Sequence, residues 1–178
     1  MRRWLVVLVL VAPWGLTAQD RVVIVVRHAE RAPEPRNDPV LSDAGSARAQ
    51  ALARALVDAG IGSVLVTPTV RTRTTGAPTA EAAQAPVIEV GLTGGVPAHL
   101  ERVAEAVRAR PAGETVLVVG HSNTVTGIIR ALGGPEMPNL CETEYAHLFV
   151  LTIPAVGSPR LVRATYGVPD PVDAATCR

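Results

Sequence analysis

The chain has 178 residues, of which 48% are hydrophobic and 3% aromatic, and its 17 basic residues nearly balance its 16 acidic ones. This length and apolar content predict one folded domain with a proper core and exclude a disordered chain. A balanced charge and few aromatic side chains for stacking on bases argue against nucleic acid as a partner.

The N-terminal segment has the pattern of an export signal. Arg2 and Arg3 provide a positive start, the uncharged apolar run from Trp4 to Leu16 follows, and a small residue precedes the expected cleavage point. An uncleaved membrane anchor is the alternative, but this run is shorter than the about 20 residues that span a bilayer. We expect residues 1–18 to be a cleaved signal peptide and residues 19–178 to be a single periplasmic or secreted domain with no stable membrane span.

Export would place the two cysteines, Cys141 and Cys177, in an oxidising compartment. A disulfide that ties the C-terminal tail to the domain is then one interpretation, and two unrelated thiols are the other. Sequence spacing cannot decide between them, because it does not give the separation of the two residues.

Segments typical of strands and of helices alternate along the chain. The β-branched run from Arg21 to Val26 shows no polar alternation, which predicts a central strand covered on both faces. Helical spacing of apolar residues follows from Ala44 to Ala59, with Ser42 as N-cap and Gly60 as stop. Further strands are expected at residues 63–67, 87–90, 115–120, 148–153 and 161–165, and further helices at about 70–84, 100–107 and 125–132, the helix at 70–84 being irregular at Gly76 and Pro78. This order predicts an α/β domain, a three-layer α/β/α sandwich with a mostly parallel central sheet.

Two of the expected strands end in histidine. His28 follows the first strand, with Arg27 before it, and His121 follows the strand at 115–120. Arg71 lies four residues after the end of a third strand. Because ligands bind at the carboxyl ends of parallel strands, two histidines and two arginines should gather at one edge of the sheet. That set of side chains suits a phosphate dianion.

Four motifs in this order resemble the histidine phosphatase superfamily, which is phosphoglycerate mutase-like in fold. They are Arg27-His28-Ala29-Glu30, the segment Asp38–Gly45 at the entry to the first helix, the segment Thr67–Thr75, and Gly120-His121-Ser122-Asn123. Together they span most of the predicted domain. The resemblance implies a compact, exported member of that superfamily.

The resemblance implies a role for each matched residue. His28 would be the nucleophile that becomes phosphohistidine, Arg27, Arg71 and His121 would hold the non-bridging oxygens, and Asn123 would contact substrate. Fixed cations around the equatorial oxygens stabilise the transition state of phosphoryl transfer, so neither a metal ion nor another cofactor is expected.

Some assignments stay open at this point. The proton donor to the leaving oxygen could be Glu30, Glu89 or Glu144, and each could equally be a surface carboxylate. Arg73 is a rival to Arg71, but the motif spacing selects Arg71. His99 and His147 match no motif and are expected to be structural or surface residues.

The leading hypothesis is a metal-independent phosphatase that hydrolyses phosphomonoesters or phosphoramidates through a phosphohistidine on His28, with a small phosphorylated substrate as its partner. A phosphomutase is one alternative, and a non-catalytic phosphate- or phosphosugar-binding protein is another. Binding of a phosphate analogue without hydrolysis would identify the latter. The natural substrate and the oligomeric state do not follow from the sequence.

Overall fold

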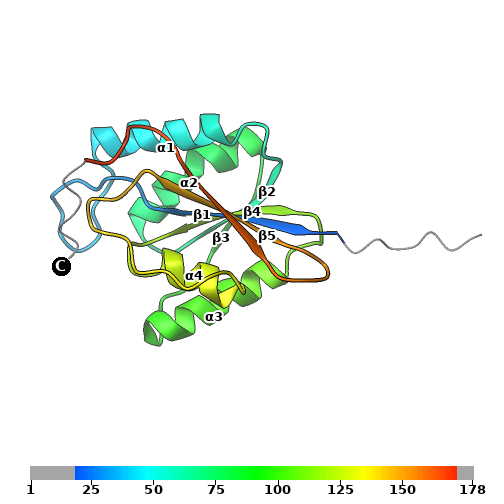
Figure 1. Cartoon of the computed structure of the whole chain (residues 1–178). Coiled ribbons are helices and arrows are strands. Elements are labelled where there is room, and N and C mark those ends of the chain that lie inside the picture. Colours follow the sequence, from blue (N-terminus) through cyan, green and yellow to red (C-terminus); the bar gives the residue numbers. More distant parts are fainter. Residues whose placement is uncertain (1–18, 172–178) are drawn as a thin grey trace, which may run out of the picture.

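A six-stranded sheet lies between two pairs of helices in the computed structural model, which describes residues 19–171 (Figure 1). In chain order the elements are β1 (Arg21–Arg27), α1 (Asp43–Ala55), β2 (Ile61–Val66), α2 (Val70–Ala83), β3 (Val87–Glu89), α3 (Gly95–Arg108), β4 (Thr115–Gly120), α4 (Val125–Ala131), β5 (His147–Ile153) and β6 (Arg160–Thr165). The predicted three-layer α/β/α sandwich is confirmed.

The sheet has the order β3-β2-β4-β1-β5-β6, and β3, β2, β4 and β1 run parallel. Only β5 is reversed, since it pairs antiparallel with both β1 and β6. Register places Arg27 of β1 opposite Gly120 of β4, and the His28 amide donates to the Gly120 carbonyl at 2.9 Å. The residues that follow the two strands, His28 and His121, therefore lie side by side at the carboxyl edge of the sheet.

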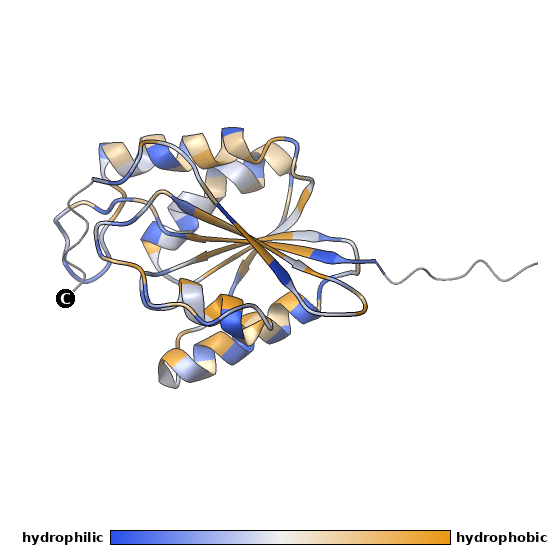
Figure 2. Cartoon of the chain, viewed as in Figure 1, coloured by the Kyte–Doolittle hydropathy of each residue, from blue (hydrophilic) through white to orange (hydrophobic). Residues whose placement is uncertain are grey.

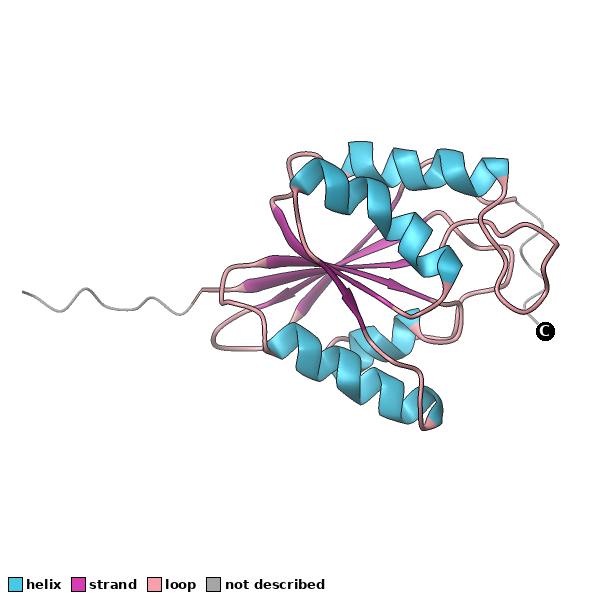
Figure 3. Ribbon diagram, turned by 180° about the vertical axis from the view of Figure 1, so that it is seen from behind, coloured by secondary structure: helices cyan, strands magenta, loops and turns pink. Residues whose placement is uncertain are grey.

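Both faces of β1 are buried, which explains its uninterrupted apolar sequence. Val23 and Val25 pack into the cluster beneath α3 and α4, while Ile24 and Val26 pack into the cluster beneath α1 and α2. The views from the two sides show α1 and α2 on one face of the sheet and α3 and α4 on the other (Figures 1 and 3). Hydropathy colouring shows the apolar residues concentrated on the strands and on the inner sides of the helices (Figure 2).

Three helices differ from the sequence prediction, and one of them, α3, begins at Gly95, five residues before the predicted start. Helix α1 begins after Ser42, whose hydroxyl accepts a hydrogen bond from the Gly45 amide as predicted, but it ends at Ala55, four residues before the predicted end, in a turn closed by Leu56. Helix α2 continues through Pro78 as one helix rather than an irregular one. Gly76 allows α2 to approach the sheet closely, because a Cβ at this position would lie 2.9 Å from Val64.

Two predictions from the sequence concern residues outside those that the structure describes. These are the signal peptide at residues 1–18 and Cys177. Cys141 is buried and is not a free thiol, and its pairing with Cys177 stays a prediction. Along residues 19–171, no helix combines the length and apolar character that crossing a bilayer requires.

Candidate active site

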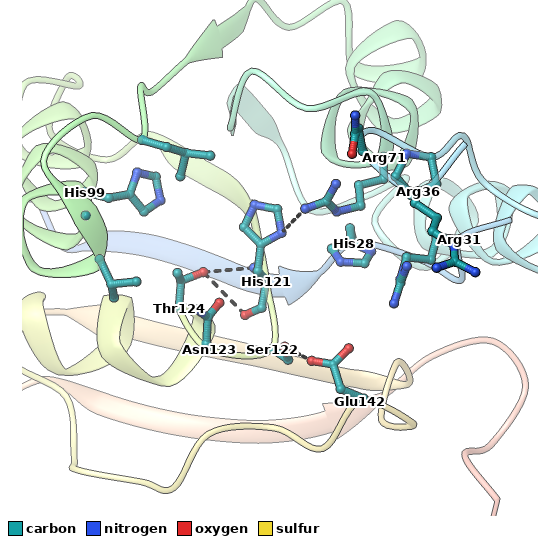
Figure 4. A pocket seen from close by; sticks show the side chains of 15 residues that line it. His28, Arg31, Arg36, Arg71, His99, His121, Ser122, Asn123, Thr124 and Glu142 are labelled. Carbon is teal, nitrogen blue, oxygen red and sulfur yellow. Dashed lines mark hydrogen bonds between the residues drawn. The ribbon is translucent and has the colours of Figure 1, made fainter. Parts of the chain in front are cut away.

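An open cavity of about 580 Å³ lies at the carboxyl edge of the sheet, where the loops after β1, β2 and β4 meet (Figure 4). Both motif histidines and Arg71 line it. The other lining residues are Arg31, Arg36, Asn37, Pro39, Leu92, Gly95, Val96, His99, Ser122, Asn123, Thr124 and Glu142. The structure thus brings His28, His121, Arg71 and Asn123 together from distant parts of the sequence.

The ring of His28 is fixed in one tautomer. Its Nδ1 lies 2.8 Å from the carbonyl oxygen of Ala29, and because a carbonyl can only accept, Nδ1 carries the proton. The other ring nitrogen, Nε2, therefore keeps its lone pair. Burial lowers the pKa of His28 to about 4, and the neighbouring cations Arg27 and Arg71 act in the same direction. The neutral ring thus has the electronic state that a nucleophile needs near neutral pH.

His121 is held in the opposite tautomer. Its Nδ1 lies 3.5 Å from the Arg71 guanidinium, which can only donate, so the neutral ring carries its proton on Nε2 and donates it to the Thr67 hydroxyl at 3.1 Å. Burial, together with the charges of His28 and Arg71, lowers the pKa of His121 to about 3. The two histidine rings approach edge to face, with centroids 5.3 Å apart.

Arg71 extends from the first turn of α2 into the cavity (Figure 4). Asp38 fixes this turn, because its carboxylate accepts the Val70 amide at 3.0 Å and lies 3.6 Å from the Arg71 guanidinium. The rival Arg73 forms an ion pair with Glu89 at 2.9 Å and does not line the cavity. Of the two arginines, the structure therefore places the one selected by motif spacing in the site.

Arg27, by contrast, does not line the cavity. Its side chain is 1% exposed, and its terminal nitrogens donate to the carbonyls of Cys141 and Glu144 at 2.6 and 3.1 Å and to the Glu142 carboxylate at 2.8 Å. The guanidinium also stacks on the Tyr145 ring, 4.1 Å from its centroid. In this structure Arg27 anchors the loop before β5, whereas the sequence predicted contact with phosphoryl oxygens.

The three carboxylates named as candidate proton donors all lie outside the cavity. Glu30 forms a bidentate ion pair with Arg48, and Glu89 is paired with Arg73. Glu144 accepts the Cys141 amide at 2.7 Å and lies 3.4 Å from His147. Each carboxylate thus has a partner within the protein and does not line the cavity.

Glu142 is the acidic residue that lines the cavity among the residues described, and sequence reasoning did not single it out. It belongs to a segment that matches no motif, so no local pattern marks it. Its place on the cavity follows from the pairing of β5 with β1 and from the bonds of Arg27 to this loop. Glu142 could have been found only by knowing which loop packs on the Arg27 side chain.

Two further histidines have different environments. His99, expected to be structural or on the surface, is buried at the cavity wall and held by the Gly91 carbonyl at 3.0 Å. His147 lies on β5 outside the cavity.

Across residues 19–171, no three His, Cys, Asp or Glu side chains gather in an arrangement that could hold a metal ion. The positive groups that reach into the cavity are the arginines.

Comparison with known proteins supports the predicted resemblance. The model of the histidine phosphatase superfamily (branch 1) matches residues 23–91, a segment that contains His28 and Arg71 but ends before His121. No curated protein matches the sequence. The prediction of a resemblance to this superfamily is confirmed.

Solved structures show the same fold. The phosphohistidine phosphatase SixA from Nakamurella multipartitia is 24% identical, with a TM-score of 0.57, over 85% of this chain and 98% of its own. A protein histidine phosphatase SixA complexed with tungstate is 20% identical, with a TM-score of 0.61, over 81% and 96%. A phosphoglycerate mutase from Plasmodium falciparum is 18% identical, with a TM-score of 0.61, over 85% and 95%. At these identities the structures establish the fold alone.

Proposed function

Because the chain resembles the histidine phosphatases and carries their fold, we propose that it is a metal-independent phosphatase that uses His28 as its nucleophile. Its substrates would be phosphomonoesters or phosphoramidates. The observation that carries the proposal is the His28 ring in the cavity, with Nδ1 bound to the Ala29 carbonyl and Nε2 free to attack.

The reaction would proceed in two transfers. In the first, the lone pair of His28 Nε2 attacks phosphorus, an N–P bond forms, and the P–O or P–N bond to the leaving group breaks with its electron pair. In the second, a water oxygen attacks the same phosphorus, the N–P bond breaks, and its electrons return to Nε2. Arg71, which lines the cavity, would neutralise charge on the phosphoryl oxygens in both steps.

His121 would assist by binding a phosphoryl oxygen through the nitrogen that faces Arg71. That nitrogen, Nδ1, is unprotonated in the free protein, so donating from it requires the ring to take up a proton or to exchange tautomers. A bound dianion favours the protonated ring by electrostatic attraction. Oxyanion binding should therefore be coupled to proton uptake at His121.

Hydrolysis of p-nitrophenyl phosphate in EDTA tests the proposal. The protein should be active, His28→Asn should lose at least about a thousandfold in kcat, and His147→Asn, a histidine outside the cavity, should keep wild-type activity. Equal activity of wild type and His28→Asn would rule out His28 as nucleophile. An inactive wild type that still binds tungstate would favour a phosphate-binding protein instead.

We also propose that the protein acts outside the cytoplasm, which rests on the residue pattern of positions 1–18 alone. Expression of the full chain in a bacterium, followed by fractionation and mass measurement, tests this. A periplasmic product that begins near Gln19 is expected. An uncleaved product retained in the cytoplasm would contradict it.

A further inference from the structure

We propose that Glu142 is the general base that activates water for hydrolysis of the phosphohistidine on His28. The inference rests on the proposed phosphatase function and adds a catalytic residue that no motif in the sequence indicates.

Glu142 lies at the cavity and is open to water. Its carboxylate is the acidic group that lines the cavity within the described part of the chain, and its side chain is 71% exposed, so water reaches it. One oxygen accepts a hydrogen bond from the Ser122 hydroxyl, in the loop that carries His121. Figure 4 shows this carboxylate beside Ser122, on the same cavity as His28. The arrangement places an acceptor for a water proton on the same cavity as the nucleophile.

The loop that carries Glu142 is firmly held. Arg27 bonds the carbonyls at both ends of the Cys141–Glu144 turn, and the Leu140 amide donates to the Ser122 carbonyl at 3.0 Å. The Tyr145 ring covers the Arg27 guanidinium and also lies edge to face with His28, with centroids 6.2 Å apart. An acid–base group needs such a fixed position, because proton transfer depends on geometry.

The charge state of Glu142 agrees with a base. The hydrogen bond from Ser122 lowers its pKa, and the Arg27 charge acts in the same direction. The side chain is therefore a carboxylate when the phosphohistidine must be hydrolysed.

Hydrolysis of the phosphohistidine would transfer one proton from water to Glu142. The water oxygen forms a bond to phosphorus while a water proton passes to a Glu142 oxygen, and the N–P bond breaks with its electrons returning to His28 Nε2. The products are inorganic phosphate, neutral His28 and protonated Glu142. The proton then leaves to solvent or to the leaving group of the next substrate, which restores the carboxylate.

Glu142→Gln tests the proposal, because glutamine keeps a hydrogen-bonding oxygen and loses the basicity. With p-nitrophenyl phosphate, kcat should fall at least about a hundredfold, whereas kcat/KM should stay within about threefold of wild type or rise. The reason is that kcat/KM reports the first transfer, in which this leaving group needs no proton. The variant should accumulate phosphohistidine, detected by intact mass after an alkaline quench, with a burst of nitrophenol. Glu89→Gln, which removes a carboxylate outside the cavity, should behave as wild type.

Three results would overturn the proposal. These are a kcat within threefold of wild type, a kcat/KM that falls as far as kcat, or a slowed variant with no accumulated phosphoenzyme. A role for Glu142 in neutralising Arg27 alone would lower the free energy of unfolding and affect both transfers, so it would give the second result. Failure of phosphatase chemistry itself is recognised separately, because the wild type would then be inactive or indifferent to His28→Asn.

Discussion

The free energy of unfolding should fall as the pH is lowered from 6.5 to about 4, in part because of His28. In the folded protein, burial lowers the pKa of this ring from 6.5 to about 4, whereas in the unfolded chain it keeps its ordinary value. Between these two pH values the unfolded state binds one proton more than the folded state. Stability is therefore lost as pH falls through this window, and no further loss arises from this group below pH 4.

The size of the effect follows from the same pKa change. Each tenfold change in an acid dissociation constant corresponds to about 1.4 kcal/mol, so the fall from 6.5 to about 4 corresponds to about 3 kcal/mol. Urea unfolding followed by far-ultraviolet circular dichroism at a series of pH values measures it for wild type and for His28→Gln. The carboxylates titrate in both proteins, so the difference between the two curves isolates His28. Curves that stay parallel from pH 7 to 4 would refute the reasoning.

Three further predictions concern the cavity, each measured by steady-state kinetics with p-nitrophenyl phosphate. Arg71→Ala should lower kcat/KM by about 10²–10³. Arg73→Ala loses only an exposed ion pair and should change kcat/KM less than threefold. Equal losses would refute the choice of Arg71 as the phosphate-binding arginine. Thr67→Val removes the acceptor of the His121 Nε2 proton and should lower kcat/KM about five- to tenfold; an unchanged value would show that the hydroxyl does not fix the ring. Arg31→Ala should raise KM severalfold, because this exposed cation at the cavity lies near enough to lower the pKa of the nucleophile electrostatically; an unchanged KM would contradict that.

The elements and layers were predictable because their signals are local. An uninterrupted apolar run such as Val22–Val26 predicts a strand buried on both faces, and the structure buries it so. The serine before Asp43 predicts a helix start and caps it. The end of α1 was missed because the alanine periodicity continues beyond Ala55 although the hydrogen-bonded helix does not. The regularity of α2 depends on packing, because Gly76 fits closely against β2. The local sequence does not indicate this contact.

The site was predictable in so far as its residues follow strands. The ends of β1 and β4 bring His28 and His121 together, and the register that does so follows from two neighbouring parallel strands. Arg71 reaches the same cavity from the first turn of α2. The environment of Arg27 was not predictable, because its partners lie more than a hundred residues away, in a loop whose docking depends on the pairing of β5 with β1.

Arg27 and Arg71 differ in how far their charge is compensated by groups of the protein itself. Arg27 is buried and bound to two carbonyls and a carboxylate, so its charge is already compensated within the protein. Arg71 is compensated in part by Asp38 at 3.6 Å, and it turns its other terminal nitrogen toward His121. A phosphoryl dianion entering the cavity would therefore meet Arg71 as the stronger attractive charge. Arg27 would act through the loop it holds, which carries Glu142 to the lining of the same cavity.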